Sequence, residues 1–208
     1  MDVYNPLTLA GYDWYVLGFS NARVWRCPTP LLLRHYDEHV SAAHLDVGVG
    51  TGYFLDKCRF PVSTPTIVLM DLNPYPLHVA ARRIQRYRPR TLRANILEPI
   101  RWDGPRFDSI AMNYVLHCLP GTIVEKAVAF AHLTPLLNDG CPLFGSTILH
   151  GGVRQTRGSR RVMALYNAIG VFGNSDDTLD GLDRALAEHF SRHELTTSGS
   201  VALFTAWK

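Results

Sequence analysis

The 208-residue sequence predicts an α/β protein whose strands form a doubly wound, mostly parallel sheet. Five short apolar segments alternate with segments whose apolar residues recur at helical spacing, and this alternation is typical of β–α units. A turn with three glycines follows the first strand segment and leads directly into a helix. The last two strand segments flank a Ser198-Gly199-Ser200 turn, so we expect a terminal hairpin that adds an antiparallel strand.

Composition predicts one globular domain over residues 1–208, because 47% of the residues are hydrophobic and 19% are charged. No apolar run reaches the length of a membrane span, and the first residues lack the pattern of a signal peptide. The four cysteines form no C-x-x-C pair and the nine histidines lack metal-binding spacing. We therefore expect a cytoplasmic protein with reduced thiols and no bound metal. A net charge of +3 is too small to indicate nucleic acid.

Caps and periodicity define the elements of the first half of the chain. Thr29 is expected to cap a helix that has Pro30 in its first turn, and Asn73-Pro74 is expected to start another. In order, we expect a helix over 29–40, a strand over 43–48, a helix from the glycines to about 59, a strand over 66–71, a helix from 73, and a strand over 92–96.

The second half of the chain continues the alternation. Asn138-Asp139-Gly140 favours a turn and is expected to end a helix. In order, we expect a strand over 107–112, a helix over about 121–137, a strand over 141–149, helices over about 158–170 and 177–190, and strands over 193–197 and 201–207.

The most informative segment runs from Asp46 to Gly52, where a strand ends in an acid and three alternating glycines. Glycines let a ligand approach the backbone closely, and the following helix offers free N–H groups and a positive dipole end. A second acid, Asp71, ends the next strand segment, where a carboxylate can accept both hydroxyls of a ribose. Together these residues predict a site for an adenosine-containing ligand at the carboxyl edge of the sheet.

Spacing and charge narrow the choice of ligand. The dinucleotide fingerprint is G-x-G-x-x-G, whereas Gly48, Gly50 and Gly52 alternate, so the third glycine comes one position early. No Lys-Ser/Thr pair follows the glycines, which excludes a P-loop. A carboxylate at Asp46 would repel a pyrophosphate, but it suits an ammonium or sulfonium group.

At these positions the chain resembles the class I S-adenosylmethionine (SAM) dependent methyltransferases, whose first motif is acid-x-Gly-x-Gly-x-Gly. The resemblance covers about residues 43–208 and includes the terminal hairpin. It implies a Rossmann-like, seven-stranded, mostly parallel sheet with an antiparallel C-terminal strand. It also implies SAM as cofactor and S-adenosylhomocysteine as product. The cofactor-binding residues implied by the resemblance are Asp46, Gly48, Gly50, Gly52, Asp71, Leu72, Asn95, Ile96 and Asn113.

Asn95 departs from the family pattern, which usually has an aspartate there for the exocyclic amine of adenine. An amide oxygen can accept the same hydrogen bond, and the amide NH₂ can donate to a ring nitrogen. The alternative is an ordinary turn, because asparagine favours turns.

Asn113 and His117 follow the fourth strand, whose end lies beside the sulfonium and the acceptor in similar methyltransferases. We expect Asn113 nearest the methionine portion of SAM. His117 lies one turn further, and an ordinary histidine pKa of about 6.5 makes it a candidate general base. A lone histidine is also compatible with a structural role.

The N-terminal segment is rich in aromatic residues and precedes the first strand, where small methyltransferases carry a lid. Aromatic rings suit a sulfonium cation, but the same residues are equally suited to a hydrophobic core. We expect residues 1–42 to form a helical lid and the helical segment 150–190 to line the substrate side. The candidate substrate residues are Tyr4, Tyr12, Tyr15, Trp25, His117 and His150.

The expected activity is transfer of the SAM methyl group to an O, N, S or C nucleophile of a small molecule, as in secondary metabolism. Alignment and exclusion of water are the main tasks, because the methyl donor is already activated. Two alternatives are a SAM-binding cyclase or isomerase and a non-catalytic, methyltransferase-like partner subunit. The intact glycines and acids argue against loss of ligand binding.

Overall fold

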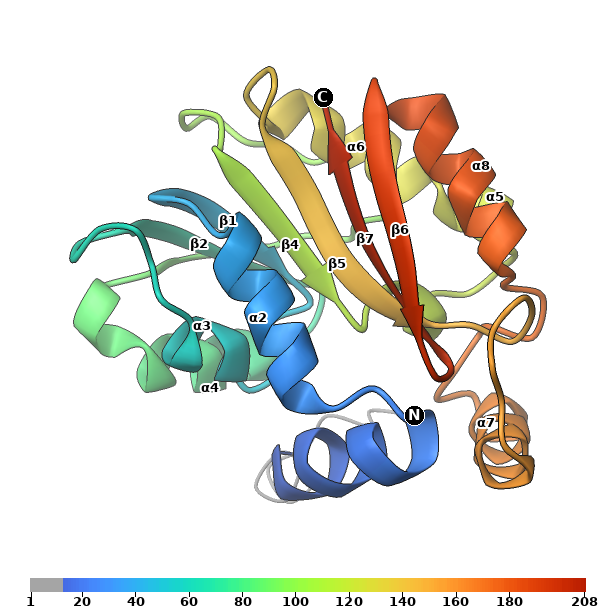
Figure 1. The fold of residues 1–208 in the computed structure, drawn as a ribbon. Helices are drawn as coiled ribbons and strands as arrows, with labels where there is room; N and C mark the ends of the chain where they lie inside the picture. Colours follow the sequence, from blue (N-terminus) through green and yellow to red (C-terminus); the bar gives the residue numbers. More distant parts are fainter. Residues whose placement is uncertain (1–12) are drawn as a thin grey trace.

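The computed structural model describes residues 13–208, in which seven strands form one sheet (Figure 1). The strands are β1 (Ala43–Val47), β2 (Thr66–Asp71), β3 (Arg90–Arg93), β4 (Ser109–Asn113), β5 (Pro142–Ile148), β6 (Arg192–Ser198) and β7 (Val201–Trp207). Their order is β3-β2-β1-β4-β5-β7-β6; the first five are parallel, and β7 runs antiparallel between β5 and β6. This confirms the predicted Rossmann-like, doubly wound, seven-stranded sheet.

Helices cover both faces of this sheet. Figure 1 shows α2 in front of the sheet and α5, α6 and α8 behind it. The helical elements are η1 (Asp13–Trp25, a π-helix), α2 (Thr29–His39), α3 (Tyr53–Lys57), α4 (Pro74–Arg83), η2 (Gln85–Tyr87), η3 (Leu116–Cys118), α5 (Ile123–Lys126), α6 (Val128–Leu133), η4 (Thr134–Leu136), α7 (Arg157–Ala168) and α8 (Leu179–His189). No helix within residues 13–208 is both long and apolar enough to cross a membrane.

The predicted N-cap of α2 is wrong. Thr29 is the first residue of the helix and Pro28 precedes it as the cap residue. The hydroxyl of Thr29 donates instead to the backbone carbonyl of Leu17, so it ties α2 to η1.

Two elements differ most from their predicted bounds, and the others differ by at most two residues at their ends. The expected helix over 121–137 consists of α5, α6 and η4 in succession. Pro135 lies in η4, and its missing N–H explains why the α-helix does not continue through this residue. Strand β3 lies at the edge of the sheet and spans Arg90–Arg93 rather than 92–96, because the chain turns at Asn95.

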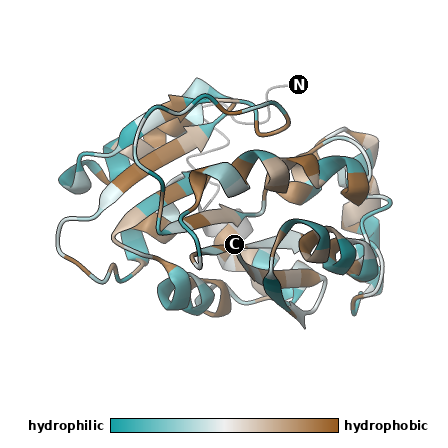
Figure 2. Ribbon diagram, turned by 90° about the horizontal axis from the view of Figure 1, so that it is seen from above, coloured by the Kyte–Doolittle hydropathy of each residue, from teal (hydrophilic) through white to brown (hydrophobic). Residues whose placement is uncertain are grey.

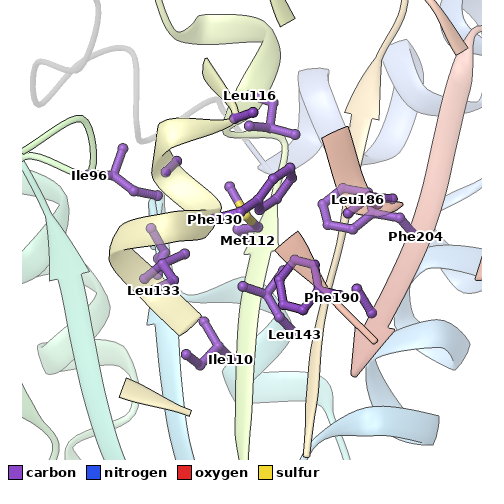
Figure 3. Close-up of a cluster of buried hydrophobic side chains, with 14 of the residues drawn as sticks. Ile96, Ile110, Met112, Leu116, Phe130, Leu133, Leu143, Leu186, Phe190 and Phe204 are labelled. Atoms are coloured by element: carbon purple, nitrogen blue, oxygen red, sulfur yellow. The ribbon is translucent and has the colours of Figure 1, made fainter. Parts of the chain in front are cut away.

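The hydrophobic core lies on both faces of the sheet. One cluster joins the sheet to α5, α6 and α8; within it Phe130 packs 5.7 Å from Phe190 and 6.1 Å from Phe204, between ring centroids (Figure 3). A second cluster joins the other face to α2, α3 and α4. Helices in Figure 2 carry hydrophobic residues beside hydrophilic ones, as expected when one helix face is buried. The buried central strands therefore offer their ends, rather than their faces, to a ligand.

The terminal hairpin contacts the N-terminal part of the structure. The backbone N–H of Ser200 donates to the carbonyl of Trp25 over 2.8 Å. The hydroxyl of Ser198 donates to the carbonyl of Arg26 over 3.0 Å. The junction between η1 and α2 is thus fastened to the turn between β6 and β7.

Candidate functional site

Two adjoining cavities open at the carboxyl ends of β1, β2 and β4, with volumes of about 40 and 150 Å³. Gly48 and Gly50 line both cavities. The first is also lined by Asp46, Gly52, Tyr53, Phe54, Asn113 and Tyr114. The second is also lined by Asp71, Leu72, Asn95, Ile96, Cys118 and Leu119. All nine predicted cofactor residues thus lie at one or both cavities.

The glycine turn leaves room for a ligand at one position and for a helix at another. At Gly50, where φ is +51°, a Cβ atom would meet nothing within 4 Å, so this backbone faces open space. At Gly52 a Cβ atom would come 3.1 Å from the Cα of Ala80, because α4 packs tightly against the turn. Because Gly50 also lines both cavities, we expect a side chain there to reach space that a ligand would occupy.

Asp46 is held from behind by buried hydrogen bonds. Its Oδ2 accepts a hydrogen bond of 2.5 Å from the hydroxyl of Tyr36, on α2. That hydroxyl lies 2.8 Å from Nε2 of His44, and Nδ1 of His44 lies 2.7 Å from Oγ of Ser109. Burial raises the pKa of Tyr36 well above its ordinary value, and the negative charge of Asp46 adds to this effect. Tyr36 therefore remains a hydrogen-bond donor to the carboxylate.

Asp71 ends β2 at the second cavity. Its Oδ1 accepts the backbone N–H of Asn73 over 2.9 Å. Burial raises the pKa of Asp71 to about 6, although backbone N–H groups partly offset this rise. The next residue, Leu72, is 60% exposed at the rim of the cavity and offers an apolar surface to a flat ligand group.

Asn95 lies at the second cavity and also forms a turn. Its Oδ1 accepts the backbone N–H of Leu97 over 3.1 Å, and its Nδ2 donates to Glu98 over 2.9 Å. The two readings of Asn95 from the sequence are therefore compatible, because an amide oxygen has a second lone pair for a ligand.

Asn113 and Tyr114 close the first cavity at the end of β4. The amide oxygen of Asn113 accepts a hydrogen bond of 2.8 Å from the hydroxyl of Ser146, on β5. Tyr114 has a positive φ of 59°, an uncommon conformation for a residue with a side chain. This backbone turn directs the chain away from the sheet immediately beside the cavity.

His117 is 3% exposed and is not among the residues that line these two cavities. Its Nδ1 accepts the backbone N–H of Ile148 over 3.3 Å, and its ring packs edge-on against Phe172, 4.6 Å between centroids. Burial lowers its pKa to about 3, and the positive charge of Lys126 contributes. The imidazole is therefore neutral throughout the physiological pH range.

The predicted substrate residues have different positions. Tyr4 and Tyr12 lie outside the described residues, and Tyr15 is described only by its backbone within η1. Trp25 is 2% exposed and belongs to a hydrophobic cluster with Ile148 and Met163, among others. His150 is exposed in the loop after β5. Neither Trp25 nor His150 lines the two cavities.

A buried ion pair fixes the loops that follow β5. Nζ of Lys126 lies 2.6 Å from Oδ2 of Asp177, and both side chains are fully buried. The same ammonium donates to the carbonyl of Gly173 over 2.7 Å. The carbonyl of Asp177 accepts the backbone N–H groups of His150 and Gly151, over 2.9 and 3.0 Å. This pair thus joins α5 to the loop before α8, and Asp177 joins that loop to the residues that follow β5.

Some site residues were not predicted from the sequence. Tyr53 and Phe54 directly follow the last glycine, and their position in the motif was a sufficient signal to include them. Tyr36 and Lys126 gave no such signal, because their partners are ten and 51 residues away. Within residues 13–208, no group of three or more His, Cys, Asp or Glu side chains is arranged to hold a metal ion.

The strand order, the glycine turn and the two strand-end acids together define the class of SAM-dependent methyltransferases. Comparisons with known proteins agree. A family model described as a methyltransferase domain matches residues 45–143. Demethylluteothin O-methyltransferase from Streptomyces thioluteus is 40% identical over 204 residues, which cover 98% of this chain and 89% of that protein. Methyltransferase aurB from Calcarisporium arbuscula is 40% identical over 221 residues, covering 99% and 95%.

The chain therefore belongs to the methyltransferase family, and SAM is its cofactor. Among solved structures, the N-methyltransferase NodS from Bradyrhizobium japonicum, in complex with S-adenosyl-L-homocysteine, has a TM-score of 0.59 at 16% identity. The match covers 86% of this chain and 83% of NodS. At this identity the likeness shows the shared fold.

Proposed function

We propose that this methyltransferase transfers the methyl group of SAM to a hydroxyl oxygen of a small secondary metabolite. The observation that carries the proposal is the pair of joined cavities: Asp46 lines one, Asp71 lines the other, and Gly50 lines both. SAM has an ammonium group at one end and ribose hydroxyls nearer the other, and each suits a carboxylate. The choice of oxygen is supported by the relative from Streptomyces thioluteus, which is named an O-methyltransferase.

The residues of the two cavities fit the parts of SAM in order. Asp46 and Asn113 would hold the methionine portion, and the backbone at Gly48, Gly50 and Gly52 would lie against the ligand. Asp71 would accept the ribose hydroxyls. Leu72, Asn95 and Ile96 would contact the adenine ring.

When bound, SAM would supply an electrophilic methyl group to the acceptor oxygen, with S-adenosylhomocysteine as the leaving group and the hydroxyl proton released to solvent. The residues of this chain align the two reactants and exclude water from them. Because His117 is buried, lines neither cavity and has a pKa of about 3, which makes it a weak base, we propose that it packs between the ends of β4 and β5 rather than acting as a base.

We further propose that residues 1–42 and 150–190 enclose the acceptor. Support comes from Leu17 of η1, which lines the first cavity, and from α7, which packs beside η1.

A cytoplasmic location is supported by four cysteines that are free thiols. The small net charge of +3 supports a small-molecule acceptor over nucleic acid.

The affinity for S-adenosylhomocysteine is expected to fall as the pH decreases through about 6. The pKa of Asp71 is about 6 in the ligand-free protein, and ribose hydroxyls donate to its ionised form. Protons therefore compete with the ligand below that pH, by about tenfold per pH unit, and do not compete above about pH 7. Titration calorimetry at a series of pH values measures this profile.

Asp71→Asn provides the control for that profile. The variant should bind about tenfold or more weakly at pH 8, because it loses charge-assisted hydrogen bonds, and it should lack the decline near pH 6. A flat wild-type profile, or a variant that retains the decline, would assign the titration to another group.

The proposed reaction is tested with methyl-labelled SAM and a panel of hydroxylated aromatic and enolic acceptors. We expect S-adenosylhomocysteine to appear together with a product labelled on oxygen. Label on nitrogen, sulfur or carbon in the preferred acceptor would contradict O-methylation. Protein treated with EDTA should remain active, as expected for a reaction that needs only SAM and an acceptor.

A further inference from the structure

We propose that Tyr36, supported by His44, is a positioning residue that orients the carboxylate of Asp46 toward the amino group of the SAM methionine. This inference rests on the proposed placement of SAM, because Asp46 is assigned there to the methionine end. Neither Tyr36 nor His44 lines the cavity, so both would act through Asp46.

The hydrogen bonds that reach Asp46 through Tyr36 form one continuous network, and all its donors are oriented in the same direction. Because Tyr36 donates to Asp46, its oxygen can accept from Nε2 of His44. This tautomer leaves Nδ1 of His44 to accept from the hydroxyl of Ser109, over 2.7 Å. Ser109 in turn accepts the backbone N–H of Ser41 over 2.9 Å. Each donor in this hydrogen-bond network is therefore oriented toward the carboxylate of Asp46.

Because the network is buried, its side chains are held in one hydrogen-bonding arrangement. Tyr36, His44 and Ser109 are fully buried, and the side chain of Asp46 is only 12% exposed. In a buried network each unpaired donor or acceptor is costly, so the members hold one another in place. Oδ2 of Asp46 is fixed by Tyr36, and the orientation of the whole carboxylate follows from that bond.

The ring of Tyr36 is held independently of its hydroxyl. It stacks on Phe54 with an interplanar angle of 8° and a centroid distance of 5.6 Å. It also packs edge-on against Phe144, 5.2 Å away. Tyr36→Phe therefore removes the donor to Asp46 while the packing of the ring remains.

The experiment compares two ligands by titration calorimetry. S-Adenosylhomocysteine has the amino group, whereas 5′-methylthioadenosine lacks the amino-acid portion and keeps the nucleoside. Tyr36→Phe should weaken binding of S-adenosylhomocysteine by about tenfold and leave binding of 5′-methylthioadenosine within about twofold of wild type. Tyr87→Phe is the matched control, because Tyr87 packs against Phe60 away from both cavities, and it should change neither affinity.

Two further variants make the outcomes distinguishable. Asp46→Asn should lower the ratio of the affinity for S-adenosylhomocysteine to that for 5′-methylthioadenosine. An unchanged ratio would overturn the placement of the methionine portion at Asp46. If Asp46→Asn lowers the ratio and Tyr36→Phe does not, the positioning role is overturned. Equal weakening of both ligands by Tyr36→Phe would also overturn it, since that result indicates a general loss of structure.

His44→Ala keeps Tyr36 and removes the donor behind it. We expect a fall of about threefold in affinity for S-adenosylhomocysteine, with 5′-methylthioadenosine unchanged, because the support is indirect. This variant carries the test if Tyr36→Phe does not fold. Wild-type affinity for S-adenosylhomocysteine in a folded His44→Ala protein would overturn the role of His44.

Discussion

Gly50→Val is expected to abolish SAM binding, with a rise in Kd of about a hundredfold or more, equivalent to about 2.8 kcal/mol. Gly50 lines both cavities and its Cβ position faces open space, so we expect a valine side chain to occupy volume that the ligand needs. Titration with S-adenosylhomocysteine measures the loss. The positive φ of Gly50 adds a stability loss of about 1–2 kcal/mol, which thermal unfolding measures separately.

Gly140→Val is the matched control for that variant. Gly140 also has a positive φ, +75°, and a Cβ atom there would meet nothing within 4 Å. It lies in the turn before β5, at the opposite end of the sheet from the cavities. Gly140→Val should lose similar stability and keep wild-type affinity. Normal binding by Gly50→Val would show that the ligand does not lie against this backbone.

Lys126→Met is expected to destabilise the protein by about 3–5 kcal/mol, because it leaves the carboxylate of Asp177 buried without its partner. The carbonyl of Gly173 also loses its donor. Denaturant unfolding followed by circular dichroism measures the change. The double variant Lys126→Met/Asp177→Asn should recover part of the loss, because it removes the uncompensated charge.

Lys57→Met provides the comparison for a surface ion pair. Lys57 lies 3.1 Å from Asp56, but its side chain is 51% exposed, so its removal should cost about 0–1 kcal/mol. If Lys126→Met costs no more than Lys57→Met, the buried pair does not hold these loops in the way proposed.

The sequence predicted the strands well because their burial on both faces leaves a clear apolar pattern. The segment around Asp46 was enough to predict that β1 is followed by a helix, and β2 spans Thr66–Asp71 as predicted. The edge strand was less well predicted because charged residues such as Arg90 and Arg93 hide its periodicity. The helix before β5 was predicted as one element because the break between α5 and α6 leaves no strong signal, although Pro135 was a signal that the α-helix ends before η4.

In the candidate site, residues of contiguous motifs could be predicted from the sequence, whereas residues that depend on distant partners could not. Residues of the glycine turn and Asp71 lie in contiguous motifs, and all of them line a cavity. The buried state of His117 was not predicted, because it depends on Phe172 and on the backbone of β5. Tyr36 was not singled out from the sequence. Its hydroxyl acquires a role only when α2 is placed against β1.

The attachment of η1 to the terminal hairpin has a consequence for the order in which the chain folds during synthesis. The contact from Ser198 to Arg26 joins residues 172 positions apart, so η1 cannot reach this support until nearly the whole chain has left the ribosome. Such distant pairings are slow to form. The central strands can assemble earlier, and η1, which the bond from Thr29 to Leu17 ties to α2, gains its support from the hairpin last. A nascent chain that stops before β6 would thus have most of the sheet, and its η1 would lack the contact with the hairpin.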